Sequence, residues 1–588
     1  MRIFSCAGRR VFLSAALAAL LLSSLSACGT ATPAQTTLTA DAESTTAITT
    51  VTTTAEQQEE TVLIENGKSA YFVINSRTAD AETTAVTRDF ISKLETKTGV
   101  KLKLYPDSYT ESDCEIIVGN VRNRAAAAAR LKEIDYFSWG VKKEGNQFII
   151  TAHSQEGIEM ALRELLAHIE EKDGRWVILG DIEASGTVDK NVPVIPVCQG
   201  ENATVAGLYQ CGEDSVEVCL RGITKAEYES YADTLTAGGW VKYTENAMAS
   251  NLYATYTNQD GRTVHLGYYP TLQNGTLRIV NEPTGYLPAT TAPAYTRVAD
   301  TTFTQIKRKA ADINNAPGMS YIMQLADGSF ILIDGGPANT DDEDDLLAYL
   351  KSLTPAGQKP VIAAWFITHA HSDHMALANN FITKYHNEVE VRMAAYNFPI
   401  YEAVKDAKDV NNTASRYQPM IDLFIESIRK YWPQADHFVI HAGQKLYLAD
   451  AEIEIFFTHE DLFPLAYTWI NHTSTAFRIT SGGKTIMMLG DCEKSICQQM
   501  ADTFGEYLKS DMLQLAHHGA NGACMDLYQR IDPEICFWAC SKDKFENDER
   551  MLGTKAGQEF NAYLRDTSIR VREHYHNSIT TIIPITQK

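Results

Sequence analysis

The chain has 588 residues, of which 44% are hydrophobic, and its formal net charge at pH 7 is −22. This length predicts about three or four domains, and the apolar content suffices for a core in each. This acidic charge argues against a basic groove that follows a nucleic-acid backbone. We therefore expect no stable nucleic-acid complex. It also argues against a protein that lies flat on an anionic membrane.

The first residues resemble an export signal. Three arginines within the first ten residues precede an apolar run at 11–22, which is short for a membrane span. The run leads into Leu25-Ser26-Ala27-Cys28, which resembles the lipobox of bacterial lipoproteins. The resemblance implies a signal peptide at 1–27 and a lipidated Cys28 that anchors the protein to the extracytoplasmic face of the cell membrane. An ordinary secretory signal is the alternative.

Residues 28–61 are rich in Thr and Ala without a hydrophobic period, which predicts a disordered tether. From 62 to 190 the pattern alternates between strands and helices. We expect strands at 70–74 and 115–119, a hairpin at 140–151, and helices at 82–98 and 155–171. This region resembles the small α/β domain that precedes catalytic domains in several glycoside hydrolase families. The resemblance implies an accessory module next to an envelope polymer or glycan.

Residues 191–290 predict a small α+β domain. A strand is expected at 214–221, and a helix begins at Thr224, with Glu227 placed to complete a capping box. Further strands are centred near Tyr253, Val264 and Leu277. A linker rich in Pro, Thr and Ala follows at 287–293.

The third region, 295–588, also alternates between strands and helices, so the whole chain is expected to be α/β (α+β). Strands at 321–325 and 330–333 flank a hairpin turn, and the acidic run 341–345 indicates a solvated helix start. The continuous apolar stretch 361–368 is typical of a strand in a sheet that is covered on both faces.

Directly after that strand come the residues that carry the chemistry. His369 and His371 are two positions apart, so an extended backbone directs both imidazoles to the same side. Asp373 and His374 follow where the chain turns into a helix that begins near Met375. Three imidazoles and one carboxylate therefore converge in one loop, a set of donors that suits zinc or a mixed metal site.

The segment His369 to His374 matches the HxHxDH motif and resembles metallo-β-lactamase-fold hydrolases. One segment before this motif and two after it also resemble the family, in the same order along the chain. They are ILIDGG at 331–336, Gly490-Asp491 after a strand at 486–489, and LQLAHHG at 513–519. The resemblance implies a C-terminal four-layer αββα sandwich that holds two divalent metal ions. It also implies that Asp334 stabilises the site without binding metal.

Residue by residue, the resemblance implies a ligand set. One metal falls to His369 and His371, the other to Asp373, His374 and His517, and Asp491 bridges the two. A further ligand usually precedes the bridging aspartate, and His472 is the candidate. His574 and His576 compete with it, although a solvated strand face is the preferred interpretation of that pair.

Two metals that share a water would lower its pKa and give hydroxide at neutral pH. The imidazole count favours zinc, while manganese or iron also suits the ligand types. Asp373 would orient the hydroxide as well as bind metal, and His518 would donate a proton or a hydrogen bond to the transition state.

The substrate follows from a second resemblance. The segments His517-His518-Gly519 and Asn471-x-x-Ser474 resemble the nuclease domain of the competence protein of the DNA-uptake channel, and also surface phosphorylcholine esterases. They favour a phosphodiester in an envelope polymer, a lipid headgroup or a short nucleotide. An exported nuclease, or a surface glycan-binding lipoprotein with a non-catalytic hydrolase domain, remain the alternatives.

Overall fold

The computed structural model describes residues 59–588, except for 78, 80, 122, 189–194, 213, 307–308, 310–317, 339–340, 401–413, 463–469, 567–571, 577–580 and 586–588. The predicted signal peptide, Cys28 and nearly all of the predicted tether therefore lie outside the described residues. Among the helices that are described, none combines the length and the apolar character that crossing a bilayer requires.

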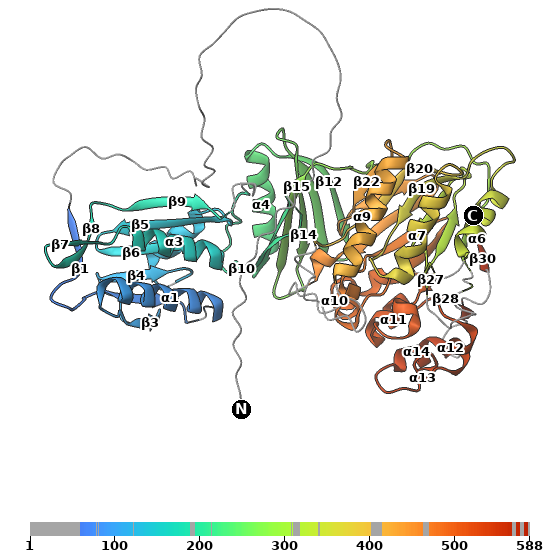
Figure 1. The fold of residues 1–588 in the computed structure, drawn as a ribbon. Coiled ribbons are helices and arrows are strands. Elements are labelled where there is room, and N and C mark those ends of the chain that lie inside the picture. The colour runs from blue at the N-terminus through green and yellow to red at the C-terminus, as the bar shows by residue number, and fades with distance from the viewer. Residues whose placement is uncertain are drawn as a thin grey trace, which may run out of the picture. The chain divides into compact units, whose positions relative to one another are not determined.

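The N-terminal part of the described chain contains a six-stranded mixed sheet in the order β3-β2-β4-β6-β5-β9. Its strands are β2 (Phe72–Asn75), β3 (Leu104–Pro106), β4 (Glu115–Val118), β5 (Ser138–Glu144), β6 (Gln147–Ala152) and β9 (Glu183–Thr187). The helices of this part are α1 (Ala81–Thr98), α2 (Ala125–Glu133) and α3 (Gln155–Ala167). The predicted strand–helix alternation is thus present (Figure 1).

A small three-stranded sheet accompanies it, in the order β1-β8-β7. Its strands are β1 (Glu60–Ile64), β7 (Glu170–Lys172) and β8 (Arg175–Leu179). The helix predicted to reach residue 171 is wrong in its last turn, because α3 ends at Ala167. Asp173 and Gly174 both have positive φ, 52° and 74°, and form the tight turn of a hairpin between β7 and β8. An Asp-Gly pair is a strong hairpin signal that the apolar pattern of the helix obscured.

The next region forms one antiparallel sheet in the order β10-β11-β15-β14-β13-β12. Its elements are β10 (Thr204–Gln210), β11 (Val216–Arg221), α4 (Lys225–Ala237), β12 (Val241–Met248), β13 (Asn251–Thr257), β14 (Arg262–Tyr269) and β15 (Thr276–Pro283). The capping box of Thr224 and Glu227 is confirmed. Strands β10 and β12 were not predicted. Both are edge strands, and β12 carries polar and charged side chains, so neither shows a clean apolar alternation.

The C-terminal region contains two sheets. The first has the order β22-β21-β19-β18-β17-β16-β30, with β20 paired to β19. Its strands are β16 (Thr301–Gln305), β17 (Tyr321–Gln324), β18 (Phe330–Ile333), β19 (Val361–Phe366), β20 (Glu390–Val391), β21 (Met393–Tyr396), β22 (Asp436–Val439) and β30 (Thr581–Ile585). The second has the order β23-β24-β25-β26-β27-β28-β29. Its strands are β23 (Lys445–Leu448), β24 (Ala451–Phe457), β25 (Ala476–Ser481), β26 (Lys484–Met488), β27 (Met512–Gln514), β28 (Ile535–Trp538) and β29 (Glu573–His576).

The two sheets pack face to face through a shared apolar core, in which the rings of Phe366 and Phe477 stack with centroids 4.9 Å apart. Helices α6 (Asp342–Leu353), α7 (Ser372–Tyr385) and α9 (Ala414–Tyr431) cover the outer face of the first sheet. Helices α10 (Lys494–Phe504) and α11 (Met525–Ile531) cover the outer face of the second. The predicted four-layer αββα sandwich is confirmed (Figure 1).

The acidic run at 341–345 does begin a helix, and Asp341, Asp344 and Asp345 are exposed as predicted, but Asp342 and Glu343 are buried. Asp342 is fully buried, and its carboxylate accepts a hydrogen bond from the backbone N–H of Lys309. Glu343 is 8% exposed and lies 3.6 Å from the ammonium of Lys384. These contacts come from segments distant in the sequence, so the acidic pattern alone does not reveal them.

We expect Phe477→Ala to lower the free energy of unfolding of the C-terminal domain by about 3–5 kcal/mol, because it opens a cavity between the two sheets. Leu423→Ala on α9 is the matched control, since Leu423 is 46% exposed. Urea denaturation of the full chain compares the two. Equal effects of the two substitutions would contradict a core at this position.

Candidate metal centre

Two neighbouring parallel strands of the first sheet end at the same edge. In the register of β18 and β19, Ile333 pairs with Phe366, so the residues that follow both strands leave the sheet together. Asp334 directly after β18 accepts hydrogen bonds from the backbone N–H of Thr368 (2.8 Å) and from its hydroxyl (2.9 Å). These bonds fix the chain just before His369.

Helix α7 begins at Ser372, three residues earlier than expected. His371 is therefore the N-cap, and Asp373 and His374 stand in the first turn of the helix, where a carboxylate suits the positive end of the dipole. The backbone N–H groups of Gly335 (2.6 Å) and Gly336 (3.1 Å) both donate to the carbonyl of His374. A Cβ at Gly335 would lie 2.6 Å from the backbone nitrogen of Ala378, so the approach of this loop to α7 requires glycine.

The second sheet supplies the opposite side. Asp491 follows β26, and His517 and His518 follow β27, its parallel neighbour. The side chain of Gln514 connects the two loops, because its oxygen accepts from the N–H of Leu489 (2.7 Å) and Gly490 (2.8 Å). His517 and His518 have φ of 49° and 58°. Two consecutive left-handed residues other than glycine cost about 1–2 kcal/mol each, so the surrounding structure must hold them there.

These loops bring together two groups of donor atoms, each with all its atoms within 4.8 Å of one another. The first group is His369, His371 and Asp491, and the second is Asp373, His374 and His518. Asp491 lies between them. Its Oδ1 is 3.2 Å from Nε2 of His374, and its Oδ2 is 3.8 Å from Nε2 of His369 and 3.5 Å from Nε2 of His518.

The donors fit metal ions. Several buried atoms here have no hydrogen-bond partner among the described residues: Nε2 of His374, Oδ1 of Asp491, and both ring nitrogens of His518. A buried polar atom without a partner costs about 1–3 kcal/mol, and a bound cation would remove that cost. Imidazole nitrogens mixed with carboxylate oxygens suit zinc, manganese or iron.

The electrostatics of the cluster favour ionised carboxylates. Burial by itself raises the pKa of Asp491, but His374, His518 and His517 outweigh it and hold the pKa well below its ordinary value. Burial, with the neighbouring His374, lowers the pKa of His369 well below its ordinary value. Burial lowers the pKa of His374, but Asp491 and Asp334 outweigh it and raise that pKa well above its ordinary value. A cation bound here would therefore displace a proton from this ring, because metal ligands are neutral imidazoles and ionised carboxylates.

The structure distinguishes the two adjacent histidines. Nε2 of His518 lies 3.2 Å from Oδ2 of Asp373, and the side chain is 3% exposed. Nε2 of His517 is 3.8 Å from Asp491, and its Nδ1 faces Glu493 at 3.5 Å, with the side chain 25% exposed. The donor group therefore contains His518, the predicted proton donor, where the resemblance placed His517. Sequence reasoning did not identify Glu493, which no motif marks.

Neither donor group contains any of the candidates for a further ligand. His472 is buried in a short 3-10 helix at 470–473 but belongs to neither donor group. His574 and His576 lie on β29, next to β28, and belong to neither group as well. His574 accepts a hydrogen bond from the indole of Trp538, and burial lowers its pKa to about 4, so this strand face is half-buried rather than solvated.

Asp334 has the position that the resemblance implied. Its Oδ2 is 2.7 Å from Nδ1 of His374, which leaves Nε2 of that ring facing Asp491. A carboxylate in this position orients an imidazole and increases its strength as a donor.

Comparison with known proteins agrees with the geometry. Residues 314–539 match the family model described as the metallo-beta-lactamase superfamily. A search of curated proteins gives no match.

Solved structures also align, each at 12% identity. CmlA, a diiron β-hydroxylase from Streptomyces venezuelae, aligns over 52% of this chain and 55% of its own, so the chain spans about half of that enzyme, with a TM-score of 0.28. Human tRNase Z, short form, aligns over 48% of this chain and 99% of its own, with a TM-score of 0.28. Zinc-bound PqqB from Methylobacterium extorquens aligns over 37% and 72%, with a TM-score of 0.24.

We expect Asp334→Asn to weaken zinc binding about 10- to 100-fold, because the amide removes the charge that orients His374. Competition with a chromogenic chelator measures the affinity. Asp450→Asn is the matched control, since Asp450 likewise accepts from a backbone N–H (Ala326, 2.8 Å) and a hydroxyl (Ser481, 2.8 Å) but touches no residue of the donor groups. Unchanged affinity in Asp334→Asn would refute this role.

Proposed function

Because residues 314–539 are a domain of the metallo-β-lactamase superfamily, we propose that this chain is an exported, lipid-anchored hydrolase that cleaves phosphodiesters with two divalent cations. One observation carries the metal-dependent reaction. Two groups of imidazole and carboxylate donors share the buried carboxylate of Asp491 at one edge of the sandwich. Bound there, divalent cations would lower the pKa of a water molecule and stabilise negative charge that develops on the attacked group.

The residues of this chain have distinct parts in the proposal. Asp491 holds the two donor groups together, and Asp334 orients His374 through its Nδ1. Asp373, in the first turn of α7, is the donor whose side chain is 25% exposed, so its carboxylate also faces a substrate and can orient the attacking water. Asp373 is thus both a metal ligand and a catalytic residue.

The two adjacent histidines take the opposite roles from those that the family resemblance implied. His518 is buried, and its Nε2 lies 3.2 Å from a carboxylate oxygen of Asp373 and 3.5 Å from one of Asp491, which suits a metal ligand. His517 is partly exposed and turns its Nδ1 to Glu493. That carboxylate leaves Nε2 directed to the site, where it can donate a proton to the leaving group.

A phosphodiester is the proposed substrate for two reasons. The segment His517-His518-Gly519 resembles nuclease and phosphorylcholine esterase sequences. In addition, the half-buried ammonium of Lys544 lies near enough to Asp373 for their charges to interact, so a cation is available beside the donors for an anionic substrate. The formal charge of −22 favours a short or compact phosphodiester, such as a lipid headgroup or an envelope polymer, over a long nucleic acid.

Substitutions of His517 and His518 test which of the two histidines binds metal and which donates a proton. We expect His518→Ala to lose about one zinc ion per chain, because it removes a ligand. We expect His517→Ala to keep its zinc and to lower kcat about 10²- to 10⁴-fold, because it removes a proton donor. Elemental analysis and steady-state kinetics give both values. The reverse result, with zinc lost only in His517→Ala, would restore the assignment that the family resemblance implied.

We expect Asp373→Ala to abolish hydrolysis of bis(p-nitrophenyl) phosphate while the circular dichroism spectrum stays unchanged, because the substitution removes an exposed donor and no core side chain. Asp422→Ala on the surface of α9 is the control and should keep full activity. Nitrocefin tests the β-lactam alternative in parallel. Hydrolysis of nitrocefin alone by the wild-type protein would defeat the phosphodiester, and turnover by Asp373→Ala would defeat the site.

A further inference from the structure

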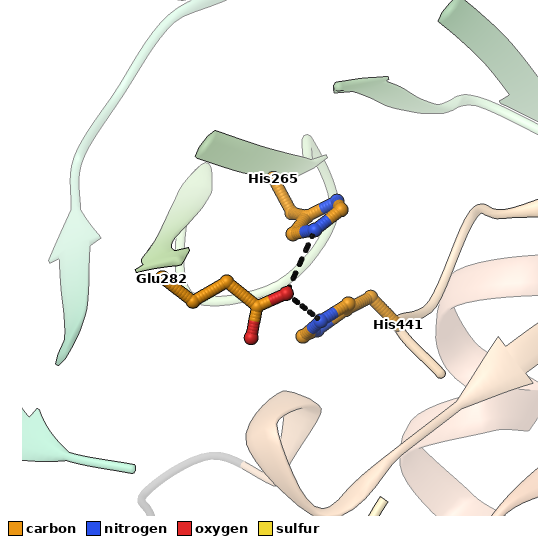
Figure 2. A group of neighbouring side chains, drawn as sticks. All are labelled: His265, Glu282 and His441. Carbon is orange, nitrogen blue, oxygen red and sulfur yellow. Dashed lines mark hydrogen bonds and ion pairs between the residues drawn. The ribbon is translucent and has the colours of Figure 1, made fainter. Parts of the chain in front are cut away.

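A second group of buried imidazoles and carboxylates lies apart from the metal centre and shares no residue with it. Its members are His265 on β14, Glu282 on β15 and His441 in the loop after β22 (Figure 2). His265 is 4% exposed and His441 is fully buried. In the sequence these are single polar residues in strands or loops, and no motif marks them.

The antiparallel sheet of β10 to β15 and the C-terminal sandwich are closely packed where this group lies. Tyr253 and Tyr269 belong to the same apolar cluster as Phe456 of β24. The buried amide of Asn251 donates to the carbonyl of Thr503 at 3.0 Å. A Cβ at Gly443 would lie 2.0 Å from the ring of Tyr253, so the contact leaves no room even for a methyl group.

Both imidazoles direct Nε2 to one oxygen. Oε1 of Glu282 is 3.3 Å from Nε2 of His265 and 3.0 Å from Nε2 of His441 (Figure 2). Ligands at 2.0–2.2 Å from a tetrahedral zinc ion lie roughly 3.3 Å from one another. The observed separations therefore match those of ligands around one ion.

The opposite ring nitrogens are held from outside. Nδ1 of His265 is 3.1 Å from the hydroxyl of Thr255, and Nδ1 of His441 is 2.7 Å from Oε2 of Glu460. A histidine that binds metal characteristically donates its other N–H to such a partner, which fixes its tautomer and its orientation. His374 in the metal centre is held by Asp334 in the same way.

The surroundings carry an excess of buried negative charge. Glu460 and Asp461 are each 96% buried, and Glu282 adds a third carboxylate, whereas burial raises the pKa of the neighbouring Glu217 well above its ordinary value. The permanent cation among them is Arg278, 2.9 Å from Glu460 and 3.1 Å from Asp461. One guanidinium does not balance these carboxylates, and uncompensated buried charge is costly. A divalent cation would reduce the excess.

We propose that His265, Glu282 and His441 bind one divalent cation of the zinc class, at a site separate from the sheet-edge centre. Two imidazole nitrogens and a carboxylate oxygen are a common donor set for zinc. The ion would join β14 and β15 to the loop that follows β22, so its role is to hold the antiparallel sheet of β10 to β15 to the sandwich. It takes no part in the hydrolysis.

Without a metal, a proton would have to do this work. Burial alone lowers the pKa of His441, but Glu460 and Glu282 outweigh it and raise the pKa to about 10, so the ring would be an imidazolium between two carboxylates. Burial, with the charge of His441, lowers the pKa of His265 to about 4, so that ring keeps a lone pair. The proton-held arrangement is the alternative that the experiment must separate from the metal site.

Anomalous scattering from crystals of the full chain grown with zinc is the direct test. Data on both sides of the zinc absorption edge should give a peak between Nε2 of His265, Oε1 of Glu282 and Nε2 of His441, in addition to peaks at Asp491. Peaks at Asp491 with none at His265 would overturn the second site and leave the proposed function intact. A peak at His265 with none at Asp491 would do the opposite.

Metal stoichiometry in solution gives an independent measurement. The double substitution His265→Gln, His441→Gln should bind one zinc ion fewer per chain than the wild-type protein, by elemental analysis after equilibration with zinc. His437→Gln on β22, which removes a half-buried histidine from the adjoining strand, is the control and should bind as many as wild type. Equal zinc content in all three would refute the site. If the double variant fails to fold, the anomalous map of the wild-type protein decides.

Discussion

The packing of the two sheets at the edge that holds the donor groups depends on one buried carboxylate, that of Asp491. Asp491 is 1% exposed, and a lone carboxylate in such a place would be strongly destabilising. Its compensation comes from the other sheet, because His369 and His374 follow β19 while Asp491 follows β26. Stability of the edge and assembly of the donors are therefore one requirement, since the sheets meet here through opposite charge as well as through apolar packing.

Buried polar contacts also fix the loops that carry the donor residues. Each loop is fixed by a buried polar side chain that has no role as a donor: Asp334 for the loop that contains His369, and Gln514 for the loop that contains Asp491. Such contacts place functional groups within tenths of an ångström before any ligand arrives. At the interface with the antiparallel sheet of β10 to β15, the ion pairs of Arg278 with Glu460 and Asp461 similarly require one specific packing.

Local sequence patterns predicted much of the fold and most of the candidate donor residues. The HxHxDH segment, the strand before it and the capping box at Thr224 depend on residues close together in the sequence, and the layer architecture follows from their order. What the sequence does not indicate depends on the tertiary structure. The directions of the His517 and His518 side chains depend on two left-handed residues that no pattern indicates, and the edge strands β10 and β12 lack the alternation of strands inside a sheet. The group at His265 is formed by three isolated residues that only the folded chain brings together.

The backbone at His517 and His518 has a consequence for how this sequence can change. Glycine adopts left-handed conformations freely, so replacing either histidine with glycine would relieve local strain and, at that turn, favour the folded state. Random drift toward greater stability would thus tend to erase both imidazoles. A chain that keeps both histidines forgoes stability at this turn, and mutagenesis aimed at thermostability alone would favour glycine beside the donor groups.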